Sequence, residues 1–171
     1  TKSLSDCRQL MLVTDALVTF NCIAQLKIWA DDSLEVAKKL TRLLSMSVDV
    51  PALLEKEVHT TLAQLFQSSD RLTEAAVHID KALAIDPESP YLINQKATLL
   101  LQAERWRSVL NLLPSTANSN SELIQRAVAS KALGLSEIDN LIDALSARFE
   151  MSKQRGDIDI SKDLALFYLK L

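Results

Sequence analysis

Glycine and proline are scarce in this chain of 171 residues, which holds two glycines and four prolines. Average usage would place roughly a dozen glycines and about eight prolines in this length. With Gly134 and Gly156 alone, the sequence has no G-x-G-x-x-G, P-loop or G-x-S-x-G element, so the usual backbone cradles for dinucleotides, phosphates and oxyanions are excluded. Tight β-hairpins, which favour Asn-Gly or similar turns, are disfavoured on the same ground.

An excess of positive charge is also missing. The 19 basic and 22 acidic residues give a formal charge of -3, and both signs are mixed along the chain. Without a basic stripe to neutralise phosphates, nucleic acid and anionic membrane surfaces are disfavoured as partners. The most apolar stretch, residues 10–30, contains Asp15, Asn21 and Lys27 and is too polar for direct insertion into a membrane.

Cysteine is limited to Cys7 and Cys22. Apolar residues at helical spacing predict one helix over residues 6–30, along which a separation of 15 residues places the two thiols roughly 22 Å apart. This distance is far beyond the reach of a disulfide, so the sequence predicts free thiols. Free thiols are typical of reducing compartments and favour the cytoplasm.

Leucine and alanine are abundant, with 31 and 19 residues. Apolar residues recur at helical spacing in almost every window, and short polar or proline-bearing segments separate these windows. The pattern predicts an all-α chain. The predicted helices cover residues 6–30, 33–46, 51–67, 71–85, 90–103, 105–113, 121–133, 136–152 and 160–171.

Residues 56–89 carry large and small side chains in a fixed order on two successive helices. The order is His59, Leu62, Ala63 and Phe66 on the first helix, then Ala75, Ile79 and Ala82 on the second, with Pro87 after it. This segment resembles a tetratricopeptide repeat (TPR), a helical hairpin of 34 residues. The alanines would let the two helices approach closely, while Phe66 and Ile79 would fill the space beside them.

Weaker copies of the hairpin flank this segment. The small residue of each first helix would be Ala24, Ala63, Ala97, Ala127 and Ala165, with separations of 39, 34, 30 and 38 residues. The resemblance implies a right-handed superhelical solenoid of antiparallel helix pairs, about 4.5 repeats in one domain over residues 1–171. In residues 115–155 the match is degenerate, and related helical-hairpin repeats are an alternative there. Because the chain starts with Thr1 and ends in a half-repeat, we expect it to be a piece of a longer protein.

Residues with catalytic or metal-binding chemistry do not form a recognised pattern. His59 and His78 fall on the two helices of one predicted hairpin, without a motif such as H-E-x-x-H. Asp157 and Asp159 alternate as in an EF-hand loop, but Lys162 stands where that loop needs glycine, so helix capping is favoured. The sequence predicts no catalytic residue, no cofactor and no metal; a rival hypothesis, that the chain is itself an enzyme, depends on the histidines and scattered carboxylates.

The resemblance also implies a binding surface. In TPR proteins the first helices line a concave groove that binds extended peptides or partner helices. The corresponding positions are Asn21, Gln25, Thr60, Gln64, Gln67, Asn94, Thr98 and Gln102. Their side chains are polar and uncharged, and the amides can both donate to and accept from a peptide backbone or sugar hydroxyls. The same residues can equally be solvated helix positions without a ligand.

The function expected from these features is that of a non-enzymatic scaffold for protein–protein interaction, binding a peptide or partner helix in the concave groove. An alternative from another class is a helical regulatory or substrate-presenting domain of a larger enzyme or of a polysaccharide-assembly protein. The identity of the partner and the oligomeric state do not follow from the sequence.

Overall fold

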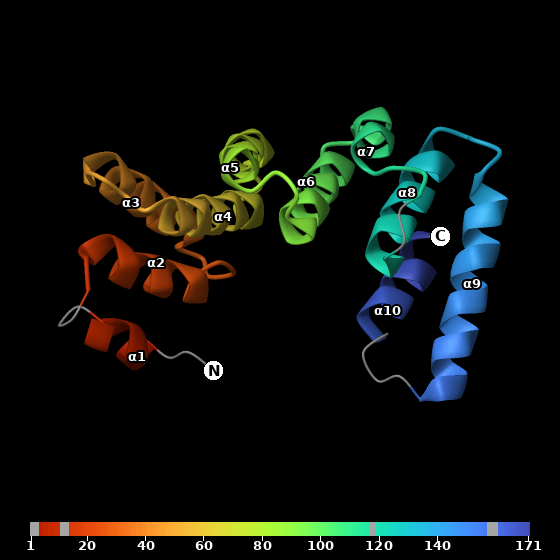
Figure 1. The fold of residues 1–171 in the computed structure, drawn as a ribbon, viewed down its shortest axis with the longest axis horizontal. Coiled ribbons are helices and arrows are strands. Elements are labelled where there is room, and N and C mark those ends of the chain that lie inside the picture. The colour runs from red at the N-terminus through yellow and green to blue at the C-terminus, as the bar shows by residue number, and fades with distance from the viewer. Residues whose placement is uncertain (1–3, 11–13, 117–118, 157–160) are drawn as a thin grey trace. The chain divides into compact units, whose positions relative to one another are not determined.

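The computed structural model describes residues 4–10, 14–116, 119–156 and 161–171, without the side chains of residues 161 and 162. In these ranges the α-helices are joined by short turns and there is no β-strand, which confirms the predicted all-α class. The helices are α1 (Leu4–Gln9), α2 (Ala16–Leu26), α3 (Ser33–Met46), α4 (Ala52–Ser68), α5 (Leu72–Ile85), α6 (Pro90–Gln102), α7 (Trp106–Leu112), α8 (Asn120–Ala132), α9 (Ile138–Arg155) and α10 (Ser161–Lys170) (Figure 1).

The helices form two compact units, Thr1–Leu92 and Ile93–Leu171, and we describe each by itself. The division falls within α6. The single repeat domain expected over residues 1–171 stays a prediction.

In the first unit, each helix packs against its neighbours in the chain, and α2 also contacts α4 (Figure 1). Its core combines Leu17 and Ala24 from α2, Leu40 from α3, and Leu62 and Leu65 from α4, all at most 1% exposed. Burying a leucine side chain completely contributes about 1.5–3 kcal/mol, so this apolar contact stabilises the α2–α4 arrangement. The helices that carry the predicted groove residues of this unit are therefore held against each other by the core.

The single helix predicted over residues 6–30 is wrong, because the chain leaves the helical conformation before Asp15. This residue has a ψ of 152°, and its carboxylate accepts a hydrogen bond from the Leu17 N–H, capping α2. The Thr14 hydroxyl donates to the Leu10 carbonyl oxygen. The Asp15 cap starts α2 as a separate helix, because a capping side chain takes the place of the backbone acceptor that a continuous helix would give the Leu17 N–H.

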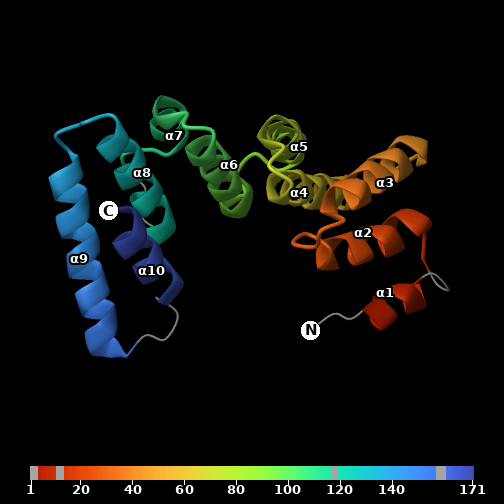
Figure 2. The same ribbon diagram turned by 180° about the vertical axis from the view of Figure 1, so that it is seen from behind.

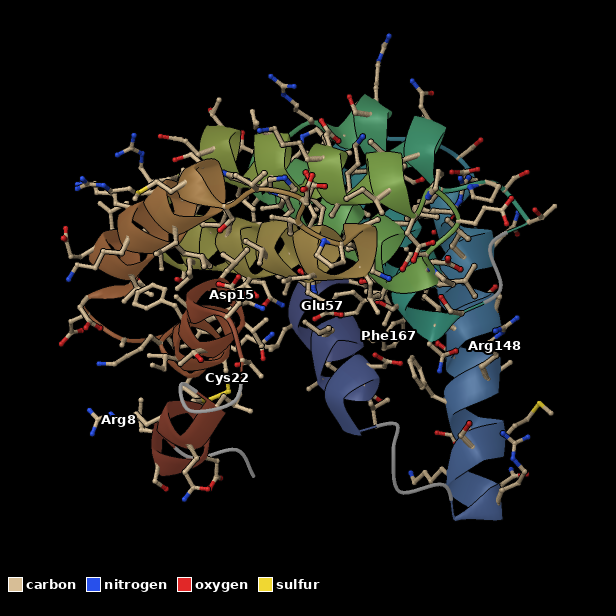
Figure 3. The ribbon with its side chains drawn as sticks, turned by 60° about the vertical axis from the view of Figure 1, so that its left-hand side comes forward. Arg8, Asp15, Cys22, Glu57, Arg148 and Phe167 are labelled. Atoms are coloured by element: carbon tan, nitrogen blue, oxygen red, sulfur yellow. A yellow bond between two sulfur atoms is a disulfide. The ribbon has the colours of Figure 1, made fainter. Side chains whose placement is uncertain are left out.

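The predicted free thiols are wrong as a result. With α1 packed beside α2, the Cα atoms of Cys7 and Cys22 lie 5.6 Å apart and the two residues form a disulfide (Figure 3). Because disulfides persist in oxidising compartments, the argument from free thiols for the cytoplasm no longer holds.

The hairpin of α4 and α5 has the close packing that its alanines predict. Ala63 is 3% exposed, and Ala75 and Ala82 are fully buried. Ile79 is buried beside them, and Phe66 packs against the core of the first unit. Small side chains at these positions let two helix backbones approach, and the larger ones fill the remaining space.

In the second unit, α8 lies between α7, α9 and α10 and contacts all three (Figure 2). The side chain and backbone of Ser119 and Glu122 form a reciprocal capping box at its start. Arg126, at a position that TPRs usually give to leucine, is 6% exposed and donates to the Leu113 carbonyl oxygen at 2.6 Å. This hydrogen bond compensates part of the cost of burying its charge.

The last helix does not use Ala165 as a packing residue, so that part of the predicted repeat pattern is wrong. Ala165 is exposed, whereas Phe167 is buried with its ring centroid 5.4 Å from that of Phe149. One large aromatic side chain buries more apolar area than an alanine, and its position decides which face of α10 turns inward. Of the two candidate caps for this helix, Asp159 lies outside the described residues, and the side chain of Ser161 is not described either.

Candidate functional site

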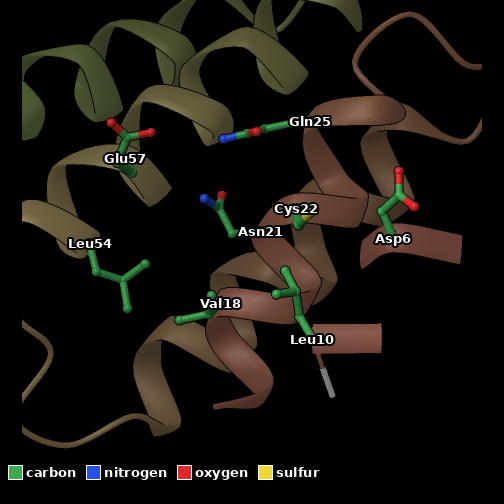
Figure 4. A pocket seen from close by; sticks show the side chains of 8 residues that line it. All are labelled: Asp6, Leu10, Val18, Asn21, Cys22, Gln25, Leu54 and Glu57. Carbon is green, nitrogen blue, oxygen red and sulfur yellow. The ribbon is translucent and has the colours of Figure 1, made fainter. Parts of the chain in front are cut away.

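Two adjoining pockets open on the first unit, one on each side of Gln25 and Glu57, which line both. The first pocket, about 310 Å³, lies among α1, α2 and α4 (Figure 4). The second, about 510 Å³, lies among α2, α4 and the start of α6. We call the two together the α4 groove, because α4 contributes to both.

The first pocket combines an apolar wall with polar groups. Leu10, Val18 and Leu54 supply the wall, and the disulfide-bonded Cys22 lies at its base. The polar residues are Asp6, Asn21, Gln25 and Glu57. A mainly apolar lining with a few placed polar groups is the usual composition of a ligand site.

Asn21 is the most unusual residue of this pocket. It is 6% exposed, and its Oδ1 atom has no hydrogen-bond partner among the described residues. Its amide points into the space between α2 and α4, toward the helix that carries Glu57 (Figure 4). A buried acceptor without a partner costs about 1–3 kcal/mol, and almost all buried polar groups have one. The fold therefore retains an acceptor that it does not itself satisfy.

The charge in the groove is negative on the α4 side. Lys56 lines the second pocket, but its ammonium group pairs with Asp86 at 3.0 Å. Glu57 is exposed, and no cation of the described chain forms an ion pair with its carboxylate. Both charged residues of the first pocket, Asp6 and Glu57, are acidic.

Hydrogen bonds orient the polar residues of the second pocket. The Thr60 hydroxyl donates to the Lys56 carbonyl oxygen at 2.8 Å, and Gln64 Nε2 donates to the Tyr91 hydroxyl at 2.6 Å. Burial raises the pKa of Tyr91 above its usual value, while the hydrogen bond from Gln64 lowers it in part. The phenol therefore stays protonated near neutral pH and can still donate to a ligand.

In the second unit, the predicted residues Asn94 and Thr98 are occupied by contacts within the protein. Gln125 Nε2 donates to Asn94 Oδ1 at 3.2 Å and to Thr98 Oγ1 at 2.9 Å, and Asn94 Nδ2 donates to Ser121 Oγ at 2.7 Å. Gln125 is 7% exposed. These hydrogen bonds join α6 to α8, so Asn94 and Thr98 have a packing role.

The predicted groove residues thus divide into those that line the α4 groove and those that do not. Asn21, Gln25, Thr60 and Gln64 line the α4 groove, whereas Gln67 and Gln102 line neither of its pockets. Sequence reasoning missed Glu57 and Tyr91 as lining residues. Glu57 precedes Thr60 by three residues and Gln64 by seven, so the helical period already placed it on the same face of α4. Tyr91 had no comparable signal, because its position depends on how α6 begins.

The two histidines form a buried pair between α4 and α5. Their Nδ1 atoms lie 3.0 Å apart, and the His78 ring stacks on Phe66. Burial lowers the pKa of both, that of His78 to about 4, and the nearby Lys81 ammonium adds to the effect. Two neutral rings can share one hydrogen bond, as packing residues do. Within the described ranges, no group of three or more histidine, cysteine or acidic side chains is placed to hold a metal ion.

No helix in the described part of the chain combines the length and the apolar character needed to span a membrane. Comparison with protein-family models, with curated proteins and with solved structures finds no match to this chain.

Proposed function

We propose that the chain is a non-enzymatic interaction module with TPR-like architecture, and that it binds an extended peptide of a partner protein in the α4 groove. The proposed architecture is a right-handed superhelical solenoid of helix pairs. On this assignment α2, α4, α6, α8 and α10 are the first helices of successive repeats.

The pattern of helix contacts supports the repeat architecture. A first helix of a TPR-like hairpin touches its own second helix, the preceding second helix and a neighbouring first helix. In the first unit α4 touches α3, α5 and α2, and in the second unit α8 touches α7, α9 and α10. Of the five small residues expected on the first helices, Ala24, Ala63, Ala97 and Ala127 are buried, whereas Ala165 on α10 is exposed.

The observation that carries the functional proposal is the position of four groove residues. Asn21, Gln25, Thr60 and Gln64 come from two helices, and all four line adjoining pockets of one unit. Three of them bear amide groups, which can each donate to and accept from a peptide bond. Pockets on either side of Gln25 and Glu57 suit a chain whose successive side chains enter different cavities.

Photo-cross-linking tests this proposal. A photoreactive amino acid replaces Gln64 in the groove or, as a control, Val77, which is 50% exposed on α5 and lines neither pocket. The probe is a pool of capped seven-residue peptides with randomised sequence. We expect a several-fold higher yield of cross-linked peptide at position 64. Equal yields at the two positions, or none at either, would overturn the proposal.

A further inference from the structure

We infer that the first pocket of the α4 groove receives a lysine or arginine side chain of the bound peptide, with its cationic group between Asn21 and Glu57. This inference rests on the proposed function and specifies the chemistry of the partner. Three observations converge on it: an unsatisfied acceptor, an unpaired negative charge and an apolar wall.

The unsatisfied acceptor is the Oδ1 atom of Asn21. Because this oxygen lacks a partner among the described residues, it can accept a hydrogen bond from an N–H or O–H donor of a ligand. A lysine ammonium offers three donors and an arginine guanidinium five, and neither is an acceptor. Gln25 also lines this pocket, at its junction with the second one.

The negative charge of the first pocket favours a cationic donor over a neutral one. Glu57 forms no ion pair with any described residue, and Asp6 places a second carboxylate in the lining of the same pocket. The nearby Lys56 is paired with Asp86 and so does not neutralise Glu57. Hydrogen bonds between ionised partners are about twice as strong as those between neutral ones, so a cationic donor suits this set of acceptors best.

The apolar wall fits the rest of the side chain. Lysine and arginine carry a hydrocarbon stem of three or four methylene groups, which packs on apolar surface while the charged end reaches polar groups. Leu10, Val18 and Leu54 supply that surface (Figure 4). A small cation without a stem would leave the wall uncovered, which favours a peptide side chain over a free metal or ammonium ion.

Binding of fixed-position peptide pools tests the inference. The probes are fluorescent, capped seven-residue pools with a central lysine, arginine, Nε-acetyl-lysine or norleucine and randomised flanks, titrated with the oxidised 171-residue chain at about 0.15 M salt. We expect the lysine and arginine pools to bind about tenfold more tightly than the other two, by fluorescence anisotropy. Glu57→Gln should remove most of this difference.

Glu35→Gln is the matched control, since it makes the same change of charge at an exposed position on α3 that lines neither pocket. Equal losses in the two variants would show a general attraction to an acidic protein and overturn the inference. Similar affinity for all four pools would overturn the cation site and leave the groove proposal standing. If no pool binds, both proposals fail. Circular dichroism of each variant checks that it is folded, and Asn21→Leu provides a second variant that should lose the same preference.

Discussion

At the scale of single residues, two asparagines that were both predicted to line a groove have opposite environments. Asn94 donates to Ser121 and accepts from Gln125, so its amide is used within the fold. Asn21 is more deeply buried, yet its Oδ1 atom has no partner among the described residues. An unsatisfied acceptor lowers stability, so the fold bears a cost at Asn21 that it does not bear at Asn94.

This contrast predicts different effects of the same substitution. Asn21→Leu should raise the free energy of unfolding by about 1 kcal/mol, because a side chain of similar size replaces an unsatisfied acceptor. Asn94→Leu should lower it by about 1–3 kcal/mol, because it removes the hydrogen bond to Ser121 and one of those from Gln125. Urea denaturation followed by circular dichroism measures both. Loss of stability in Asn21→Leu as large as in Asn94→Leu would contradict the special status of Asn21.

The buried histidine pair predicts a dependence of stability on pH. The pKa of His78 is about 4 in the folded chain, while an unfolded histidine titrates near 6.5. As the pH falls below 6.5, the unfolded chain takes up the proton first, so acid favours unfolding. We expect roughly 1–2 kcal/mol less stability at pH 5 than at pH 7.5, and His78→Leu should reduce this loss. An unchanged pH profile in that variant, measured by urea denaturation, would assign the loss to other groups.

At the scale of helices, the sequence was informative wherever apolar periodicity ended at a strong signal. Ser119 and Glu122 mark the start of α8, and Gly156, with a φ of 75°, ends α9 as a left-handed cap. The break between α1 and α2 was missed because residues 10–30 keep helical periodicity across it. Among the described residues, the local hydrogen bonds of Thr14 and Asp15 mark the break.

In the candidate site, too, some residues could be predicted from the sequence and others could not. The helical period places Thr60 and Gln64 on one face of α4, so they could be found without a structure. The first pocket could not be, because it depends on where α1 lies. A disulfide holds α1 in that position, and the predicted single helix over residues 6–30 would have kept the two cysteines too far apart to form it.

Reduction of the disulfide should therefore loosen α1 and leave the other helices of the first unit in place. The bond joins residues 15 apart, and closing a loop of this length stabilises a fold by about 3 kcal/mol. In dithiothreitol we expect faster amide hydrogen exchange in α1, with α4 and α5 remaining protected by their own core. A Cys7→Ala/Cys22→Ala variant should behave like the reduced protein in either buffer. Equal acceleration in all helices would mean that the bond supports the entire first unit.

At the scale of the whole molecule, each unit has a core of its own. The core around Leu40 and Leu62 belongs to the first unit, and the core around Leu145 and Phe149 belongs to the second. In arrays of helical repeats stability is close to a sum of local terms and neighbour contacts. The effect of a core substitution should therefore remain largely within its unit.

Phe149→Ala tests this expectation. Removing the ring should destabilise the second unit by about 3–5 kcal/mol, since it leaves a cavity beside Phe167. Hydrogen exchange should accelerate in α8, α9 and α10 and change little in α4 and α5. If protection is lost equally in both units, the chain unfolds as one cooperative body, and the local description is wrong.

The disulfide also makes ligand binding in the first pocket depend on whether Cys7 and Cys22 are oxidised in the purified sample. Cys22 lines the first pocket, and its bonded partner Cys7 anchors the helix that supplies Asp6 and precedes Leu10. Protein purified from a reducing host would have the same sequence and a different pocket. A screen that found no ligand for such material would have sampled only the unassembled surface, so thiol titration belongs before any binding measurement.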